Sequence, residues 1–322
     1  MIGNPQPCAA PANARVTSDL PDYPFTPHRF EVRPGIAMAY VDEGPRDSAP
    51  ILFLHGNPSW SYYWRRLILN LHDGYRCIAP DHVGMGLSDK PGDAPVSQPK
   101  YDYTLASRVE DLDALIEHLI AEHGAPARGW TLVLHDWGGM IGTAWACRRP
   151  ERVARLIVTN TAGFPNPKDQ VLPTTLRLGR NSKLGEWLIL KHNAFARGAA
   201  RWGVVHPLDA AVNAAFLAPY DSPANRLSTL RFVQDIPLGP QDRAWPLVES
   251  TGQQLAQFAD RPMQLLWGLK DFVFDRAFFE EWRRRFPHAE AIAYPDAGHY
   301  VLEDAHARML PAIRRFLETH PL

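Results

Sequence analysis

The strongest local signal for chemistry is an aspartate at an abrupt change of sequence pattern. In the segment LVLHDWGG, residues 132–139, an apolar stretch ends at His135-Asp136 and two glycines open the next element. Glycines suit such a tight strand-to-helix turn because it leaves no room for Cβ atoms. A carboxylate at the apex is already a nucleophile at neutral pH, and it suits attack on an sp³ carbon or a strained ring with formation of a covalent ester. The alternative is that Asp136 only caps a helix, a position that Asp favours.

Two later residues favour the catalytic interpretation. Asp271 follows the apolar stretch 265–267, and His299 follows the last expected strand, 289–294. The chain order of nucleophile, acid and histidine, each just beyond a strand, matches that of a catalytic triad in which His299 acts as acid or base and Asp271 orients it. Three other acids near these positions compete for the role of Asp271, which has the better strand-end position: Asp275, Asp296 and Asp304.

A fourth segment, His55-Gly56-Asn57-Pro58, follows the apolar stretch 51–54. We expect a backbone N–H group of this turn, with that of Trp137, to form an oxyanion hole for a tetrahedral intermediate. The side-chain amide of Asn57 and the indole N–H of Trp137 are uncharged donors suited to a halide or a carboxylate oxygen. The turn 81–88, DHVGMGLS, is interpreted as structural despite its His82. We expect neither a metal ion nor a cofactor.

The elements around these residues predict an α/β fold with a mostly parallel sheet. Short apolar strands that alternate with helices are typical of parallel sheets, whose ligand sites lie beyond the carboxyl ends of the strands. Segments 30–33 and 37–41 are expected to form an antiparallel hairpin before that alternation begins. Further strands are expected at 51–54, 75–79, 131–134, 156–159, 263–267 and 289–294. Helices are expected at 104–122, with Thr104 as N-cap, and at 138–147, 276–286 and 303–319.

The alternation stops between residues 163 and 260, where the pattern is helical without a clear strand. We therefore expect a loose N-terminal segment, 1–28, a core made of 29–162 and 261–322, and a helical cap, 163–260, over the active edge of the sheet. The alternative is that the insertion only extends the core. Apolar residues expected to line a tunnel under the cap, although core packing would explain each of them equally well, are Trp187, Leu188, Phe195, Trp202 and Phe216.

Composition excludes several classes of protein. The 322 residues are 45% hydrophobic and 21% charged, which is typical of a globular protein and not of a disordered one. The formal net charge of −1 gives no general reason to bind nucleic acid. Three widely spaced cysteines and the lack of a signal-peptide pattern in the first 22 residues favour a cytoplasmic location. No apolar run approaches 18 residues, so no transmembrane segment is expected.

One region departs from this charge balance. Residues 163–204 contain seven Lys or Arg and two acidic side chains. Such a segment is either a solvated helix face or a docking patch for an acidic partner or a membrane surface. Changing Arg177, Arg180 and Lys183 to Glu would test for docking.

Four motifs carry a family resemblance: HGNPSWSYYWR (55–65), DHVGMGLSDKP (81–91), HDWGG (135–139) and DAGH (296–299). Together they resemble the α/β-hydrolase superfamily and, within it, the haloalkane dehalogenases and epoxide hydrolases that use an aspartate nucleophile. The resemblance covers nearly the whole chain from about residue 24. It implies an α/β-hydrolase fold with a helical cap, Asp136 as nucleophile, and Asn57 and Trp137 as the residues that bind the leaving group.

Within this branch the chain is most similar to the β-lactone decarboxylases of bacterial long-chain olefin biosynthesis, through the segments 23–32, 185–188 and 271–275. The resemblance implies conversion of a cis-3-alkyl-4-alkyl-oxetan-2-one to a cis-alkene and carbon dioxide by Asp136. It also implies a hydrophobic small-molecule substrate, and a β-lactone synthetase of the same pathway as a partner. Attack at the carbonyl carbon and attack at the alkyl carbon both remain open.

Three other functions remain as alternatives. A haloalkane dehalogenase would use His299 to activate water, but Tyr220 and Gln234-Asp235 depart from the usual dehalogenase cap motif. An epoxide hydrolase would need two cap tyrosines, and Tyr220 is the only Tyr between 163 and 260. A non-catalytic ligand-binding protein of this fold is disfavoured, because every expected catalytic position holds a reactive residue.

Overall fold

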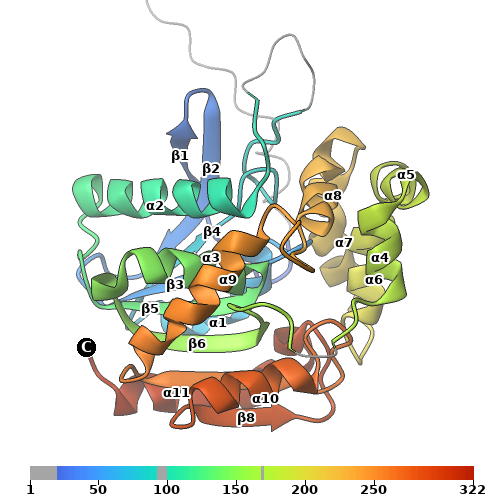
Figure 1. Ribbon diagram of the computed structural model, residues 1–322. Helices are drawn as coiled ribbons and strands as arrows, with labels where there is room; N and C mark the ends of the chain where they lie inside the picture. The colour runs from blue at the N-terminus through green and yellow to red at the C-terminus, as the bar shows by residue number, and fades with distance from the viewer. Residues whose placement is uncertain (1–19, 93–99, 168–169) are drawn as a thin grey trace, which may run out of the picture.

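The chain folds around an eight-stranded sheet with the order β1-β2-β4-β3-β5-β6-β7-β8 (Figure 1). The structure is a computed structural model, and it describes residues 20–92, 100–167 and 170–322. The strands are β1 His28–Arg33, β2 Ile36–Glu43, β3 Pro50–Leu54, β4 Arg76–Pro80, β5 Trp130–Asp136, β6 Val153–Thr161, β7 Met263–Gly268 and β8 Glu290–Tyr294. β1 pairs antiparallel with β2, and β2 with β4, which confirms the expected hairpin. The remaining pairs are parallel, as the short apolar strands predicted.

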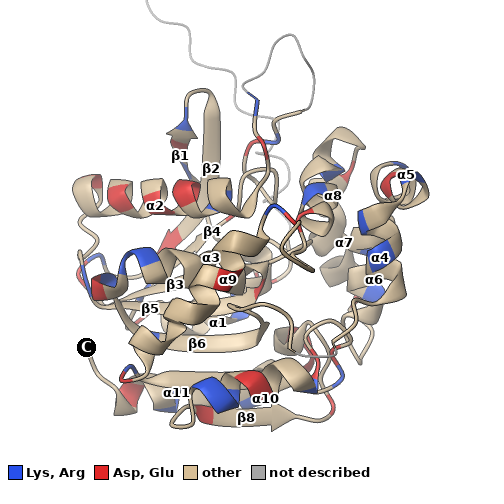
Figure 2. Cartoon of the chain, viewed as in Figure 1, with Lys and Arg blue, Asp and Glu red and all other residues tan. Residues whose placement is uncertain are grey.

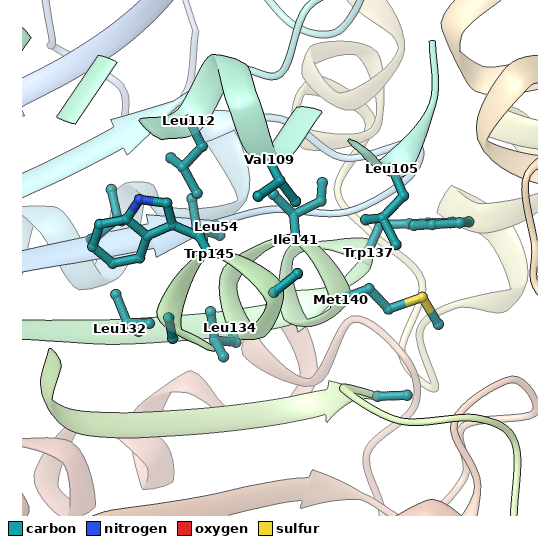
Figure 3. Packing of buried hydrophobic residues seen from close by; sticks show 14 of the residues in the cluster. Leu54, Leu105, Val109, Leu112, Leu132, Leu134, Trp137, Met140, Ile141 and Trp145 are labelled. Atoms are coloured by element: carbon teal, nitrogen blue, oxygen red, sulfur yellow. The ribbon is translucent and has the colours of Figure 1, made fainter. Parts of the chain in front are cut away.

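Helices cover both faces of the sheet. Alternate side chains of β5 point to opposite faces, so Leu132 and Leu134 join one apolar cluster and Val133 joins the other. The first face is covered by α2 Leu105–Glu122, α3 Trp137–Arg148, α9 Trp245–Gln254 and α10 Arg276–Arg285. The second is covered by α1 Arg65–Leu71 and α11 Val301–Thr319. Figure 3 shows the first cluster, where Val109 of α2 and Ile141 of α3 pack above β5. This packing fixes the start of α3 at the carboxyl end of β5.

The helix α2 begins where its sequence predicted. Thr104 Oγ1 accepts a hydrogen bond from the backbone N–H of Ser107 (3.1 Å), and the Ser107 hydroxyl accepts one from the Thr104 N–H (3.0 Å). This reciprocal cap satisfies two donors that the helix itself leaves unpaired, and such caps contribute about 1 kcal/mol.

Between β6 and β7 the described residues form helices and no strand, as predicted. They are α4 Thr174–Asn181, α5 Lys183–His192, α6 Ala194–Trp202, α7 Ala210–Leu217, α8 Leu227–Gln234 and the already named α9. Short 3₁₀ helices occur at Ser61–Trp64, Pro150–Arg152, Ala218–Tyr220, Ala224–Arg226 and Leu255–Phe258. α4, α5 and α8 pack on one another, whereas α9 packs on α3 of the core. The division of the chain into a core and a cap at residues 163 and 260 stays a prediction.

The expected loose N-terminal segment falls mostly on residues 1–19, which lie outside the described residues. Beyond them, Tyr23 and Phe25 are buried in the second apolar cluster, and Tyr23 donates or accepts a hydrogen bond with Ser61 at 2.7 Å. The side chains of Tyr23 and Phe25 therefore pack in the core, whereas Pro24, Thr26 and His28 are exposed. Among the described residues, no helix is both long enough and apolar enough to cross a membrane.

Candidate active site

The turn between β5 and α3 presents the Asp136 side chain instead of using it as a helix cap. Asp136 has φ +50° and ψ −128°, a backbone conformation that side-chain-bearing residues rarely adopt, and its side chain makes no cap hydrogen bond. A Cβ at Gly138 would overlap the backbone carbonyl of Leu54, and a Cβ at Gly139 would overlap the Thr161 side chain. The two glycines are thus required by close packing at the turn, as the sequence predicted.

The structure brings the three expected catalytic residues together. The imidazole Nδ1 of His299 lies 2.8 Å from Oδ2 of Asp271, and its Nε2 lies 3.6 Å from Oδ2 of Asp136. All three side chains are buried: their exposed fractions are 7%, 0% and 9%. The imidazole therefore bridges two carboxylates, and the acceptors that hold it in place are out of bulk water.

The charges of this bridge determine the protonation of its members. Burial by itself lowers the pKa of His299, but the carboxylates of Asp271 and Asp136 and the hydrogen bond to Asp271 outweigh burial and raise that pKa above its ordinary value. Burial also raises the pKa of Asp136, opposed by the charge of His299 and by the backbone N–H groups of Asn57 and Trp137. The imidazole is therefore protonated over a wider pH range than a free histidine.

The turn after β3 lies against the Asp136 carboxylate. The backbone N–H of Asn57 donates to Oδ1 of Asp136 at 2.6 Å. A Cβ at Gly56 would overlap the same carboxylate, so only glycine lets this turn approach. The backbone N–H groups of Asn57 and Trp137 thus face the carboxylate from two elements, as expected for an oxyanion hole.

The two expected side-chain donors are positioned differently from each other. The amide Nδ2 of Asn57 donates to the backbone carbonyl of Thr229 in α8 at 3.0 Å, and its buried Oδ1 has no partner among the described residues. Trp137 is buried against Phe232 of α8, with ring centroids 5.3 Å apart, and it lines the pocket beside Asp136. Within the described part of the chain, no residue accepts a hydrogen bond from its indole N–H. The Trp137 indole N–H is therefore available to a bound molecule.

A pocket opens above Asp136 and His299. Its wall is apolar apart from Asn57, the two ionisable groups and a few polar side chains near the 166–175 segment. No tyrosine is among its described lining residues. Tyr220, the one tyrosine between residues 163 and 260, is buried with its hydroxyl 3.4 Å from the carbonyl of Ser59. An epoxide hydrolase that activates a ring oxygen with tyrosine hydroxyls is therefore disfavoured.

The expected tunnel residues are partly right. Leu188, Phe195 and Trp202 line the pocket. Trp187 does not: its side chain is half exposed and stacks edge-on against His192. Phe216 does not either, because it packs in the core against Tyr62 and Tyr300. Aromatic content alone did not reveal which face of each helix meets the pocket.

The three competing acids all have structural partners. Asp275 caps α10 by accepting from the N–H of Ala277. Asp296 pairs with Arg308 at the surface, and Asp304 accepts from the N–H of Gly298 at 2.8 Å. Of Asp271 and these three acids, Asp271 is the one that contacts the imidazole of His299, so the strand-end argument selected the right acid.

Sequence reasoning missed one residue of the site. Asn160 lies near the end of β6, with φ +36°. Its Nδ2 donates to Oδ2 of Asp271 at 3.0 Å, and its Oδ1 accepts from the N–H of Gly268 at 2.8 Å. It therefore fixes the same carboxylate oxygen that His299 contacts. The available signal was a polar side chain at the end of the apolar strand LIVTN.

The turn 81–88 is structural, as interpreted. Asp81 accepts hydrogen bonds from the backbone N–H groups of Ser61 (2.6 Å) and Leu87 (2.8 Å). His82 is buried against His55, and burial lowers the pKa of both, that of His55 to about 4. Among the described residues, no group of three His, Cys, Asp or Glu side chains could hold a metal ion.

Comparison with known proteins identifies the fold family. Residues 49–306 match the family model described as the alpha/beta hydrolase fold, and the chain belongs to that family. A haloalkane dehalogenase from Bradyrhizobium elkani superposes with a TM-score of 0.77 at 27% identity, over 92% of this chain and 98% of the other. The overall fold is thus shared with the haloalkane dehalogenase-like branch.

Two curated relatives are more similar in sequence. A cis-3-alkyl-4-alkyloxetan-2-one decarboxylase of Xanthomonas campestris is 55% identical over 94% of this chain and 99% of its own. A protein of the same name from Shewanella oneidensis is 46% identical over 93% of this chain and 91% of its own.

Proposed function

We propose that this protein is a cis-3-alkyl-4-alkyloxetan-2-one decarboxylase, which converts a β-lactone with two alkyl chains to a cis-alkene and carbon dioxide. The observation that carries the proposal is the 55% identity to a decarboxylase of that name over almost the full length of both chains. The site supports it, because a buried carboxylate faces an apolar pocket that suits two alkyl chains. The protein is thus a lyase of the α/β-hydrolase superfamily.

We infer that Asp136 attacks the alkyl carbon that bears the ring oxygen. A new bond forms between an Asp136 oxygen and C4 of the lactone, and the bond from C4 to the ring oxygen breaks, which leaves a carboxylate attached to C3. The bond between C3 and that carboxylate then breaks. Its electron pair forms the C3=C4 double bond, Asp136 leaves as a carboxylate, and carbon dioxide departs. Atoms and electrons balance without water.

The stereochemistry of the substrate and product agrees with this path. In a four-membered ring, the bond from C4 to oxygen and the bond from C3 to the carbonyl carbon lie on the same side. Displacement from the opposite face therefore places the new aspartyl ester antiperiplanar to the carboxylate that will leave. Anti elimination from this arrangement keeps the two alkyl chains on one side, so a cis-lactone yields a cis-alkene.

The residues around Asp136 have roles in this scheme. The Trp137 indole N–H donates to the carboxylate as it forms, and Asn57 holds the cap-region helix α8 against the site through Thr229. His299, whose pKa the carboxylates of Asp271 and Asp136 raise, stabilises negative charge through its N–H groups. Elimination from the ester needs no water, so this scheme gives His299 no water molecule to activate.

The test is to incubate the purified protein with a synthetic cis-3,4-dialkyl-oxetan-2-one and to quantify cis-alkene by gas chromatography with mass spectrometry. We expect alkene from the wild type and none above background from Asp136→Ala. A haloalkane dehalogenase would instead leave the lactone intact and release bromide from a 1-bromoalkane. That result would refute the proposal and establish haloalkane dehalogenase activity instead.

We also propose how the inserted helices act, where the protein works and which enzyme supplies its substrate. The helices between residues 163 and 260 act as a cap over the pocket. The protein works in the cytoplasm. It receives its lactone from a β-lactone synthetase of the same pathway.

A further inference from the structure

Exposed apolar side chains gather around the pocket mouth. The described residues leave nine large apolar side chains exposed, and six of them lie on α4–α6 or on loops beside the pocket: Val171, Leu178, Leu184, Trp187, Trp202 and Phe272. Four of the six also line the pocket: Val171, Leu178, Trp202 and Phe272. Trp187 and Trp202 are 50% and 65% exposed, which is unusual for tryptophan. The apolar wall of the pocket therefore continues outward onto the surface.

The same surface is positively charged. Helices α4, α5 and α6 contain six Lys or Arg and one acidic residue, Glu186, and Figure 2 shows basic residues on α4 and α6 at the edge of the molecule. Two of the six are paired, Arg180 with Asp242 and Lys183 with Glu186. The other four make no salt bridge within the described residues: Arg177, Lys191, Arg197 and Arg201. We call the exposed residues of α4–α6, with Val171 and Phe272, the rim face.

We propose that the rim face docks on an anionic lipid bilayer, so that the pocket opens toward the hydrocarbon. Exposed tryptophan and leucine beside lysine and arginine are the composition of surfaces that lie in a membrane interface, where apolar groups enter the lipid and basic groups meet anionic headgroups. A rigid acidic protein would cover the pocket mouth, whereas a fluid bilayer leaves it accessible to an oily molecule. This benefit rests on the proposed function, because both the dialkyl lactone and the alkene partition into lipid.

Sedimentation with lipid vesicles tests the docking without any catalytic step. The full-length protein is mixed with vesicles of phosphatidylcholine alone or with 30 mol% phosphatidylglycerol, at low salt and at high salt. We expect binding to the anionic vesicles that high salt weakens. Binding to anionic vesicles no better than to neutral ones would refute the proposal.

Charge reversal locates the binding face. Arg197 and Arg201 are exposed, lie on α6 and do not line the pocket. Each basic residue near an anionic surface contributes about fivefold to partitioning, so Arg197→Glu with Arg201→Glu is expected to weaken binding by at least about 25-fold. The matched control, Arg148→Glu with Arg315→Glu, changes the same charge on exposed positions of α3 and α11. An equal loss in the control would contradict the assignment of the face.

Two further readouts separate this proposal from its neighbours. Both double variants are expected to convert detergent-dispersed lactone at the wild-type rate, and a wild type that makes no alkene while still binding vesicles would refute only the proposed function. A rim-face variant that keeps vesicle binding but no longer co-purifies with the lactone-producing enzyme would show a protein interface, and the membrane assignment would be wrong.

Discussion

Replacing Trp137 with phenylalanine separates the two modes of attack on the lactone. The change removes the indole N–H but keeps an aromatic ring against Phe232. It also keeps the backbone N–H of residue 137, which would serve a tetrahedral intermediate at the carbonyl carbon. Attack at the alkyl carbon needs the indole instead, because that step releases a full carboxylate into the pocket.

The magnitude follows from the type of hydrogen bond that is lost. Trp137 lines an apolar pocket, where a hydrogen bond to a charged group contributes about 1.5–3 kcal/mol. A loss of this size in the transition state corresponds to a decrease of about 10- to 160-fold in kcat/KM. The decrease is expected in the rate of alkene formation, since the bond strengthens as the carboxylate develops.

The assay measures initial rates of cis-alkene formation by Trp137→Phe, with Trp145→Phe as a matched control. Trp145 lies on the same helix, is fully buried, and donates through its indole to Asp113 at 3.0 Å, away from the pocket. The control is expected to lose stability and to keep its kcat/KM. Activity of Trp137→Phe within threefold of the wild type would refute the role of the indole and favour attack at the carbonyl carbon.

The remaining predictions concern stability. Gly138→Ala places a Cβ against the fixed backbone of β3 and is expected to destabilise the fold by at least about 1–3 kcal/mol, whereas Gly74→Ala, which meets no atom within 4 Å, should be near neutral. Glu303→Gln leaves the buried guanidinium of Arg65 uncompensated and should cost about 3–5 kcal/mol in urea unfolding. Burial raises the pKa of Asp81 to about 6. As pH falls, the Asp81 carboxylate therefore binds a proton at a higher pH in the folded protein than in the unfolded chain. Its contribution to the free energy of unfolding should therefore fall by about 3 kcal/mol as pH rises from about 4 to about 6, and Asp81→Asn should remove that slope.

Each of these predictions has a contradicting result. Equal melting temperatures for the two glycine variants would mean that the turn between β5 and α3 can widen. A small cost for Glu303→Gln would mean that water reaches Arg65. Parallel stability–pH curves for wild type and Asp81→Asn would mean that Asp81 stays ionised in the fold.

Much of the sheet could be predicted because its strands are short, apolar and buried on both faces. Ile51–Leu54 and Leu132–Leu134 are such runs, and each is followed by a glycine-containing turn that marks the carboxyl edge of the sheet. The topology then brings Asp136, Asp271 and His299 to one edge, which is why their order along the chain sufficed to select them.

What escaped prediction depends on contacts between distant segments. Trp187 and Leu188 are neighbours in sequence, yet only Leu188 lines the pocket, because the packing of α5 on α4 and α8 sets its orientation. Arg180 belongs to the basic segment but bonds Asp242 and the carbonyl of Ile236, so its reversal would disturb local packing instead of testing docking alone. Asn160 could not be recognised from the sequence, because its contacts with Asp271 and Gly268 arise from the pairing of β6 with β7.

The central claim is that Asp136 forms an alkyl ester that ends in elimination and never in hydrolysis. A single turnover of a cis-lactone in ¹⁸O-labelled water tests it most directly, with mass spectrometry of the organic products and of the peptide that contains Asp136. We predict one cis-alkene for each lactone consumed, no β-hydroxy acid, and no ¹⁸O in Asp136. A β-hydroxy acid with ¹⁸O incorporated into the Asp136 carboxylate would contradict the account, because it would show that water, activated by His299, cleaves the ester.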